Sequence, residues 1–234
     1  MKILEHRAGW LDNNSIKPIN LPNSLEALSL SLQRLNGIET DIRDLNGRLV
    51  ISHDLPGKNS LLLEDFFSLY SGVESHVMLA LNIKCDGISR LLSNLIDRYQ
   101  IKSYFTFDMS IPETIKYCRA GLSFFLRYSD FEQNPIIATP ILYSKCSGVI
   151  IDQFNYESSF VIEYDFLASL LDDNKFICIM SPELHLKNAS KNSHLVIWSQ
   201  YKKLFCLLVD KGYCIDRVFL CTDYPIKADT YFNS

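Results

Sequence analysis

Residues 37–54 read G-I-E-T-D-I-R-D-L-N-G-R-L-V-I-S-H-D, and this stretch predicts two extended segments joined by a tight turn. Apolar and polar residues alternate over Ile38–Ile42 and again over Arg48–His53. Asn46 and Gly47 between them form a dipeptide typical of a two-residue β-hairpin turn. The stretch therefore predicts a strand, a turn and a second strand.

The first of these strands carries two acidic residues on one face. Side chains two positions apart in a strand point the same way, so Glu39 and Asp41 should project together. Two carboxylates about 5 Å apart repel by about 3 kcal/mol at an effective dielectric constant of about 20. A hard divalent cation with oxygen ligands would offset that repulsion, and His53 adds a group that titrates near neutral pH. The alternative interpretation is an exposed acidic strand beside a surface histidine.

The length and composition are typical of a folded protein. At 234 residues the chain suits one domain spanning residues 1–234, and an α/β barrel can occupy this length with a single core. A hydrophobic content of 47% with 21% charged residues favours a well-packed interior. Because the net charge is −4, there is no basic footprint, and nucleic acid is not an expected partner.

The sequence also bears on location. The first seven residues, M-K-I-L-E-H-R, turn charged too early for a secretory signal peptide, and no apolar run reaches the length of a membrane span. The seven cysteines are scattered without a C-x-x-C pair, which indicates reduced thiols and does not support a zinc site. We therefore expect a cytoplasmic protein.

Short apolar segments alternate with longer segments of helical periodicity. The expected strands are Lys2–Glu5, Ile38–Ile42, Arg48–Ser52, Val77–Ile83, Ser103–Phe107, Leu122–Arg127, Gly148–Ile151, Phe176–Met180 and Val218–Cys221. The expected helices are Ser24–Leu35, Leu63–Tyr70, Ile88–Tyr99, Ile111–Arg119, Ser158–Leu171 and Leu195–Asp210.

This alternation predicts the fold class. Most of the expected strands are almost wholly apolar, as is typical of parallel strands buried on both faces. About eight strand–helix repeats favour a TIM (β/α)8 barrel over an open doubly wound sheet, and no glycine-rich fingerprint follows the first strand. We expect the helix near residues 136–147 to be irregular or missing, and the closing helix to be short or absent.

Polar and charged residues follow the apolar strands, at the end where barrel enzymes carry their active sites. Each of them alone is more often a solvent-exposed loop residue, but together they favour a site. They are His6, Arg7, Glu39, Asp41, His53, Asn82, Lys84, Asp108, Arg127, Asp152, Glu183, His185 and Asp223.

These residues resemble those of the glycerophosphodiester phosphodiesterases, a family of phospholipase C-like phosphodiesterase barrels. The family pattern is H-R-G, E-N-T, G-x-x-x-E-x-D, D-G-x-x-V-x-x-H-D, E-x-K and T-D-x-P. The segments here are H-R-A-G at 6–9, P-N-S at 22–24, G-I-E-T-D at 37–41, N-G-R-L-V-I-S-H-D at 46–54, N-I-K at 82–84 and T-D-Y-P at 222–225. The matches keep the family order and span nearly the whole chain.

The resemblance implies a metal-assisted phosphodiester hydrolase acting on a small phosphodiester. It implies that His6 and His53 are the general acid and base. Glu39 and Asp41 would hold Mg2+ or Ca2+. Arg7 would contact the phosphate oxygens, with Lys84 beside the phosphate. This agrees with the chemistry, because the reaction places charge on non-bridging oxygens and on a leaving alkoxide.

Three departures from the family pattern bear on this site. Asn82 stands where the family usually has a glutamate ligand, and its amide oxygen would bind a cation more weakly. Another carboxylate would then complete the set of metal ligands. The candidates are Asp108, Asp152 and Glu183, and we include Glu183 in the predicted ligand set. Pro22 replaces the acidic residue of E-N-T, and the short interval between Asp54 and Leu63 lacks the usual insertion that helps recognise glycerol.

Two further residues are predicted to bind substrate. Arg127 ends one expected strand, and His185 closely follows another. The alternatives are a surface salt bridge for Arg127 and an ordinary loop position for His185. His76 and His194 have no motif around them and are expected at the surface, whereas the two tryptophans are expected to pack in the interior.

Two other functions stay open at this stage. A phospholipase D-like lyase on the same barrel would form a cyclic phosphate when a substrate hydroxyl attacks in place of water. A binding protein that kept the barrel but lost metal affinity through Asn82 would turn over no diester. Phosphorus NMR of the products separates the hydrolase from the lyase.

Overall fold

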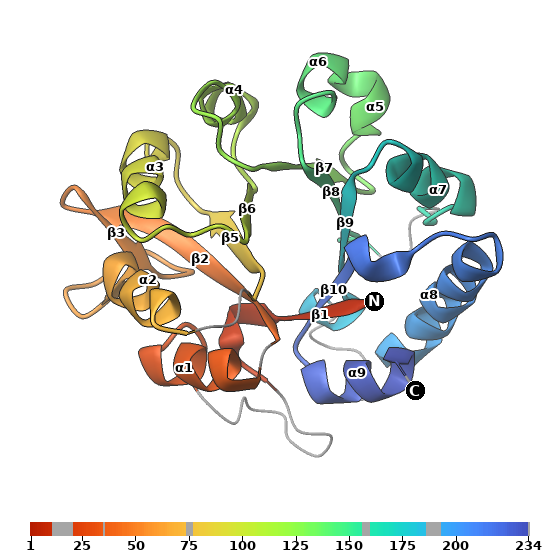
Figure 1. The fold of residues 1–234 in the computed structure, drawn as a ribbon, viewed down its shortest axis with the longest axis horizontal. Helices are drawn as coiled ribbons and strands as arrows, with labels where there is room; N and C mark the ends of the chain where they lie inside the picture. Colours follow the sequence, from red (N-terminus) through yellow and green to blue (C-terminus); the bar gives the residue numbers. More distant parts are fainter. Residues whose placement is uncertain (11–20, 35, 74–76, 156–159, 186–192, 234) are drawn as a thin grey trace. The chain divides into compact units, whose positions relative to one another are not determined.

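A computed structural model of the protein describes residues 1–10, 21–34, 36–73, 77–155, 160–185 and 193–233. Strands alternate with helices along the chain, as expected (Figure 1). The chain divides into two compact units, one of Leu4–Phe125 and one of Met1–Ile3 with Leu126–Ser234. We refer to them as the N-terminal and C-terminal units. A single domain over residues 1–234 stays a prediction.

The N-terminal unit is built around strand β2, Gly37–Leu45. The other strands are β1 (Lys2–Glu5, of which Leu4 and Glu5 belong to this unit), β3 (Arg48–Ile51), β4 (Leu61–Leu62), β5 (Leu79–Ile83) and β6 (Tyr104–Phe107). The helices are η1 (His6–Ala8), α1 (Leu25–Arg34), α2 (Leu63–Ser71), α3 (Ser89–Arg98) and α4 (Ile111–Arg119).

Strand β2 pairs in parallel with β1 and β5 and antiparallel with β3. The turn at Asn46 and Gly47 has positive φ angles of 51° and 77°, the conformation that a two-residue hairpin requires and that the sequence predicts. Helices α1 and α2 bury Leu28 and Phe66 in the apolar core of this unit. That core fixes β2, and with it the acidic residues that β2 carries.

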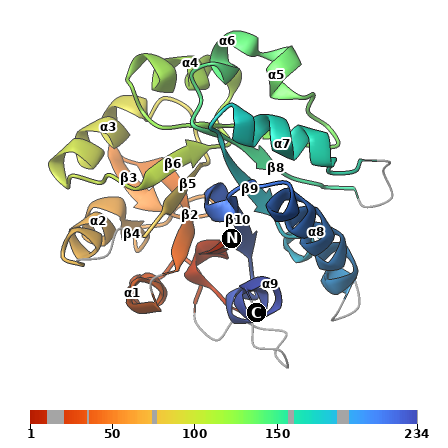
Figure 2. The same cartoon turned by 45° about the vertical axis from the view of Figure 1, so that its right-hand side comes forward.

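The C-terminal unit carries the later strand–helix repeats. Its strands are β7 (Phe125–Tyr128, beginning in the other unit), β8 (Gly148–Ile151), β9 (Phe176–Met180) and β10 (Val218–Thr222). Its helices are α5 (Pro135–Ala138), α6 (Pro140–Tyr143), α7 (Tyr164–Asp172), η2 (Pro182–Leu184), α8 (Ser193–Asp210), η3 (Ile215–Arg217) and α9 (Pro225–Asn233). Strand β9 pairs in parallel with β8 and β10, and Figure 2 shows α7 and α8 beside these strands.

Most expected elements are present, with shifts at their ends. The irregular region near residues 136–147 consists of two four-residue helices, because Pro140 cannot donate the hydrogen bond that would continue α5. Helix α7 begins at Tyr164, later than the expected start at Ser158, since Glu163 is extended. Residues 156–159 lie outside the described part. The closing helix α9 is present and has nine residues.

Two expectations about histidines and tryptophans can be compared with the described residues. The expectation of a surface position for His194 is wrong: it is 2% exposed, and its ring stacks on Tyr224. Trp198 is fully buried, as expected, whereas His76 lies outside the described residues. Within the described part, no helix combines the length and the apolar character that a membrane crossing needs.

Candidate active site

The two acidic residues of β2 are buried. Glu39 is 1% exposed and Asp41 is fully buried, so the alternative of an exposed acidic strand is wrong. Their neighbours Ile38 and Ile42 pack into the core of the N-terminal unit on the opposite face of the strand. The sheet therefore holds two carboxylates away from bulk water, where an uncompensated charge is costly.

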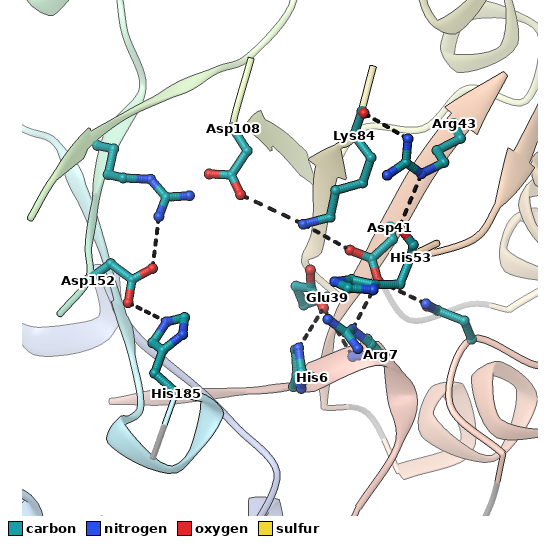
Figure 3. A network of polar contacts seen from close by, with 12 residues as sticks. His6, Arg7, Glu39, Asp41, Arg43, His53, Lys84, Asp108, Asp152 and His185 are labelled. Atoms are coloured by element: carbon teal, nitrogen blue, oxygen red, sulfur yellow. Dashed lines mark hydrogen bonds and ion pairs between the residues drawn. The ribbon is translucent and has the colours of Figure 1, made fainter. Parts of the chain in front are cut away.

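Asp41 is surrounded by donors. Its Oδ2 lies 3.0 Å from Nε of Arg7 and accepts a hydrogen bond of 2.9 Å from Nδ2 of Asn23. Its Oδ1 lies 3.3 Å from Nζ of Lys84 (Figure 3). Two cations thus balance the charges of Asp41 and Glu39, which accounts for how the N-terminal unit tolerates a buried acidic pair.

Glu39 has fewer partners. Its Oε2 accepts a 3.1 Å hydrogen bond from the backbone N–H of Arg7 and lies 3.9 Å from Nε2 of His6. Burial raises the pKa of the Glu39 carboxyl, and the nearby charge of Asp41 raises it further. The charges of His6, Arg7 and Lys84 oppose that increase in the pKa of Glu39. Glu39 is therefore the less stabilised anion of the pair.

The turn that follows β1 brings His6 and Arg7 to this pair. Arg7 and Ala8 have φ angles of 54° and 51°, in the left-handed region that L-residues rarely occupy. The left-handed turn directs the backbone N–H of Arg7 to Glu39 while its side chain reaches Asp41. Strain of this kind is typical of functional sites that surrounding structure holds in place.

Three buried oxygens of this cluster accept no hydrogen bond from the described residues, although one of them, on Asp41, lies 3.3 Å from Nζ of Lys84. They are Oε1 of Glu39, Oδ1 of Asp41 and Oδ1 of Asn82. Asp41 and Asn82 are register partners on β2 and β5, and Glu39 lies on the same face of β2 as Asp41. Buried oxygens that gather on one face without accepting hydrogen bonds fit a hard cation such as Mg2+ or Ca2+. Within the described residues, no group of three or more His, Cys, Asp or Glu side chains is arranged to hold a metal ion, so a cation bound here would need the amide oxygen of Asn82 as a ligand.

His53 follows the end of β3. Its Nδ1 lies 2.9 Å from Oδ1 of Asp54, and its side chain is 44% exposed. Figure 3 shows His6 and His53 directed toward the cluster that contains Glu39 and Asp41.

The sequence interpretation assigned no site role to two residues of this cluster, although one of them, Asn23, lies in the quoted P-N-S segment at 22–24. Asn23 donates to Asp41 and accepts from Oγ1 of Thr40, so it fixes the orientation of the Asp41 carboxylate. Arg43 donates to the carbonyl oxygens of His53 and Lys84. A signal for Arg43 was available, because it continues the same-face series of Glu39 and Asp41.

The C-terminal unit contains a second polar cluster at the ends of its strands. Asp152, which is 3% exposed, accepts from NH1 of Arg127 at 2.9 Å and lies 2.8 Å from Nε2 of His185. Phe154 lies 4.7 Å from His185 between ring centroids. Arg127 also lies 3.3 Å from a carboxylate oxygen of Glu132. Arg127 and His185 thus share one buried carboxylate within this unit.

Glu183 belongs to a different network. Both of its oxygens accept hydrogen bonds, from the hydroxyls of Ser181 and Thr222 and from the backbone N–H of Asp223. Burial raises the pKa of Glu183, and the two hydroxyl donors oppose that increase. These bonds satisfy the carboxylate without a metal, so we do not carry Glu183 into the proposed ligand set.

Comparison with known proteins defines the class of fold. No protein-family model matches the sequence, and no curated protein matches it. Solved structures match over nearly the whole chain at low identity, and they include glycerophosphodiester phosphodiesterases. The chain therefore has the TIM-barrel fold of that class, and the expected fold class is confirmed.

Individual matches show how far this similarity extends. A candidate glycerophosphodiester phosphodiesterase from Galdieria sulphuraria aligns with a TM-score of 0.68 and 16% identity, covering 100% of this chain and 98% of that one. A phosphodiesterase from Oleispira antarctica in complex with the product sn-glycerol-3-phosphate aligns with a TM-score of 0.61 and 14% identity, covering 100% and 97%. A tryptophan synthase α-subunit variant from Pyrococcus furiosus aligns with a TM-score of 0.52 and 12% identity, covering 98% and 90%. Because one fold hosts both chemistries, function must be argued from the site.

Proposed function

We propose that this protein is a metal-dependent phosphoric diester hydrolase that cleaves a small phosphodiester. The observation that carries the proposal is the cluster in the N-terminal unit, where cationic Arg7 and Lys84 lie against the buried acids Glu39 and Asp41. Two histidines flank this cluster (Figure 3). A phosphodiester anion needs cations around its non-bridging oxygens and proton donors near its leaving group, and the cluster offers both.

The histidines supply proton transfer in this proposal. One imidazole, when neutral, takes the proton of the attacking water, and the other, when protonated, gives a proton to the leaving alkoxide. Such general acid–base help is worth about 10²- to 10⁴-fold in rate for each group.

Glu39, Asp41 and Asn82 would hold the divalent cation through the three buried oxygens that accept no hydrogen bond. When bound, Mg2+ or Ca2+ would supply positive charge beside the phosphate oxygens. Arg7 binds the phosphate through its guanidinium, while Lys84 neutralises Asp41 and presents a second cation. The location of the protein in the cytoplasm stays a prediction.

Arg127 and His185 are proposed to contact the substrate. The support is that Arg127 lies near the carboxyl end of β7 and that His185 follows β9, where barrel enzymes carry their functional residues. The O. antarctica phosphodiesterase was solved with sn-glycerol-3-phosphate, which makes glycerophosphodiesters the first class to test here. The short interval between Asp54 and α2 leaves other alcohols open.

The test is turnover of a phosphodiester panel by the purified protein. The panel contains glycerophosphodiesters, sugar phosphodiesters and bis(p-nitrophenyl) phosphate, each with Mg2+, Ca2+ or Mn2+. We expect hydrolysis that stops on addition of a chelator and returns with excess metal. Phosphorus NMR showing a cyclic phosphate would favour the lyase alternative. Absence of turnover with every metal would favour the binding-protein alternative.

A further inference from the structure

Arg43 joins the two chain segments that carry His53 and Lys84. Its Nε donates to the carbonyl oxygen of His53 at 3.1 Å, and its NH1 donates to the carbonyl oxygen of Lys84 at 3.1 Å. The two acceptors are 31 positions apart in the sequence and follow different strands, β3 and β5. Figure 3 shows the Arg43 side chain reaching from β2 between them.

Arg43 lies where the pairing of β2 with its neighbours changes. The parallel register with β5 ends at Ile42, whereas the antiparallel register with β3 continues to Leu45. The N–H of Ser52 donates to the carbonyl oxygen of Asp41 at 3.0 Å, and the N–H of Lys84 donates to that of Ile42 at 2.9 Å. Arg43 is the next residue of β2 and adds a side-chain bond to each flanking segment. Its side chain therefore adds hydrogen bonds to the carbonyl oxygens of His53 and Lys84, next to these backbone hydrogen bonds.

A guanidinium suits this task better than other side chains. Its planar fork places several N–H donors in a fixed geometry, so one side chain can serve two carbonyl oxygens at once. Lysine presents a single ammonium on a flexible stem and would not fix both acceptors in this way. The half-buried position of Arg43 also keeps the two bonds from full competition with water.

We propose that Arg43 is a positioning residue, which clamps the His53 and Lys84 segments and so aligns the imidazole and the ammonium for phosphodiester hydrolysis. The clamp itself is inferred from the geometry alone. Its effect on catalysis rests on the proposed function. A misplacement of about 1 Å in a catalytic group can cost about 10²-fold in rate. Loosening these two segments should therefore lower turnover without removing any group that touches substrate.

The kinetic test compares Arg43→Ala, Arg43→Lys and Arg43→Gln with the wild-type protein. Arg48→Ala is the matched control, because Arg48 is an exposed arginine of the same hairpin that pairs with Glu64. We expect kcat of Arg43→Ala to fall by about 10- to 100-fold, with a smaller rise in KM. Low millimolar guanidinium should restore part of the lost rate in Arg43→Ala. Arg43→Lys should stay impaired, and rescue by Lys to the wild-type rate would overturn the proposal.

Hydrogen exchange tests the clamp without any assay of activity. We expect faster amide exchange at residues 52–54 and 84–86 in Arg43→Ala and Arg43→Gln, and no change there in Arg48→Ala. Unchanged exchange at both segments in both Arg43 variants overturns the clamp, whatever the activity. If the Arg43 variants exchange faster but the wild-type protein cleaves no diester, the clamp is supported and the proposed function is wrong.

Discussion

Asp41 and Asn82 are register partners on neighbouring parallel strands, so a buried acid and a neutral amide lie side by side. The amide oxygen of Asn82 has no hydrogen-bond donor among the described residues. The acidic pair is already matched by two cations, Arg7 and Lys84. The net negative charge available to attract a divalent cation is therefore small, because Arg7 and Lys84 offset the two carboxylates and neutral Asn82 adds no charge.

The first prediction concerns this charge. Asn82→Glu adds a third carboxylate and should tighten Mg2+ and Ca2+ binding by at least about tenfold, because ligand charge sets affinity at such sites. Isothermal titration calorimetry measures the affinity directly. Asn82→Gln, which keeps an uncharged amide, is the control. Equal binding by Asn82→Glu and the wild type would show that the cation does not bind here.

The second prediction concerns the two histidines. His6→Gln and His53→Gln should each lower kcat by about 10²- to 10⁴-fold, because each removes one proton-transfer group. Thermal melts should show that both variants stay folded, since His53 is partly exposed and His6 packs against a charged cluster. Diester hydrolysis that survives both changes would remove the acid–base assignment.

The third prediction uses the left-handed backbone of Asn23, whose φ is 60°. Asn23→Gly and Asn23→Ala both lose the bond to Asp41 and should lose similar amounts of activity. Only Asn23→Ala pays the steric cost of a left-handed alanine, so it should be less stable than Asn23→Gly by about 1 kcal/mol. Urea unfolding measures this difference. Equal stability of the two variants would contradict a strained backbone at this position.

The fourth prediction concerns pH and the buried His194. Burial lowers the pKa of His194 to about 4, from an ordinary value of 6.5, and the charge of Lys227 contributes. The unfolded chain therefore binds the proton first as the pH falls. The stabilising contribution of neutral His194 is complete above pH 6.5 and is lost between pH 6.5 and 4.

We expect this loss to be about 3 kcal/mol of unfolding free energy, because each pKa unit corresponds to about 1.4 kcal/mol. His194→Phe keeps an aromatic ring against Tyr224 and Trp198 but cannot take a proton. Urea unfolding at several pH values should show a shallower decrease for the variant than for the wild type over this range. Parallel curves for the two proteins would contradict the lowered pKa.

The sequence predicted the fold well where the pattern was local. Apolar runs bounded by turn residues placed β8 and β9 at the observed residues, and the proline near its start placed α4. Helix α7 was placed too early, because apolar residues near 160–163 extend its periodicity without being helical. The apolar periodicity does not distinguish the first turn of a helix from an extended segment that leads into the helix.

The site was predicted in part for a related reason. Glu39 and Asp41 were found because a strand fixes which side chains share a face. Asn23 and Arg43 were missed because their partners, Asp41 in one case and two distant carbonyl oxygens in the other, are set by tertiary contacts. Glu183 was assigned to a metal from its position after β9, whereas its hydrogen bonds satisfy both oxygens.

The sequence by itself determined the alternation of strands and helices, the hairpin of β2 and β3, and the acidic pair on one face of β2. These features follow from periodicity and turn chemistry, which act over a few neighbouring residues. Only the tertiary structure decided that the pair is buried and that Arg7 and Lys84 neutralise it. It also decided that Arg43 ties His53 to Lys84, because such contacts depend on which strands become neighbours.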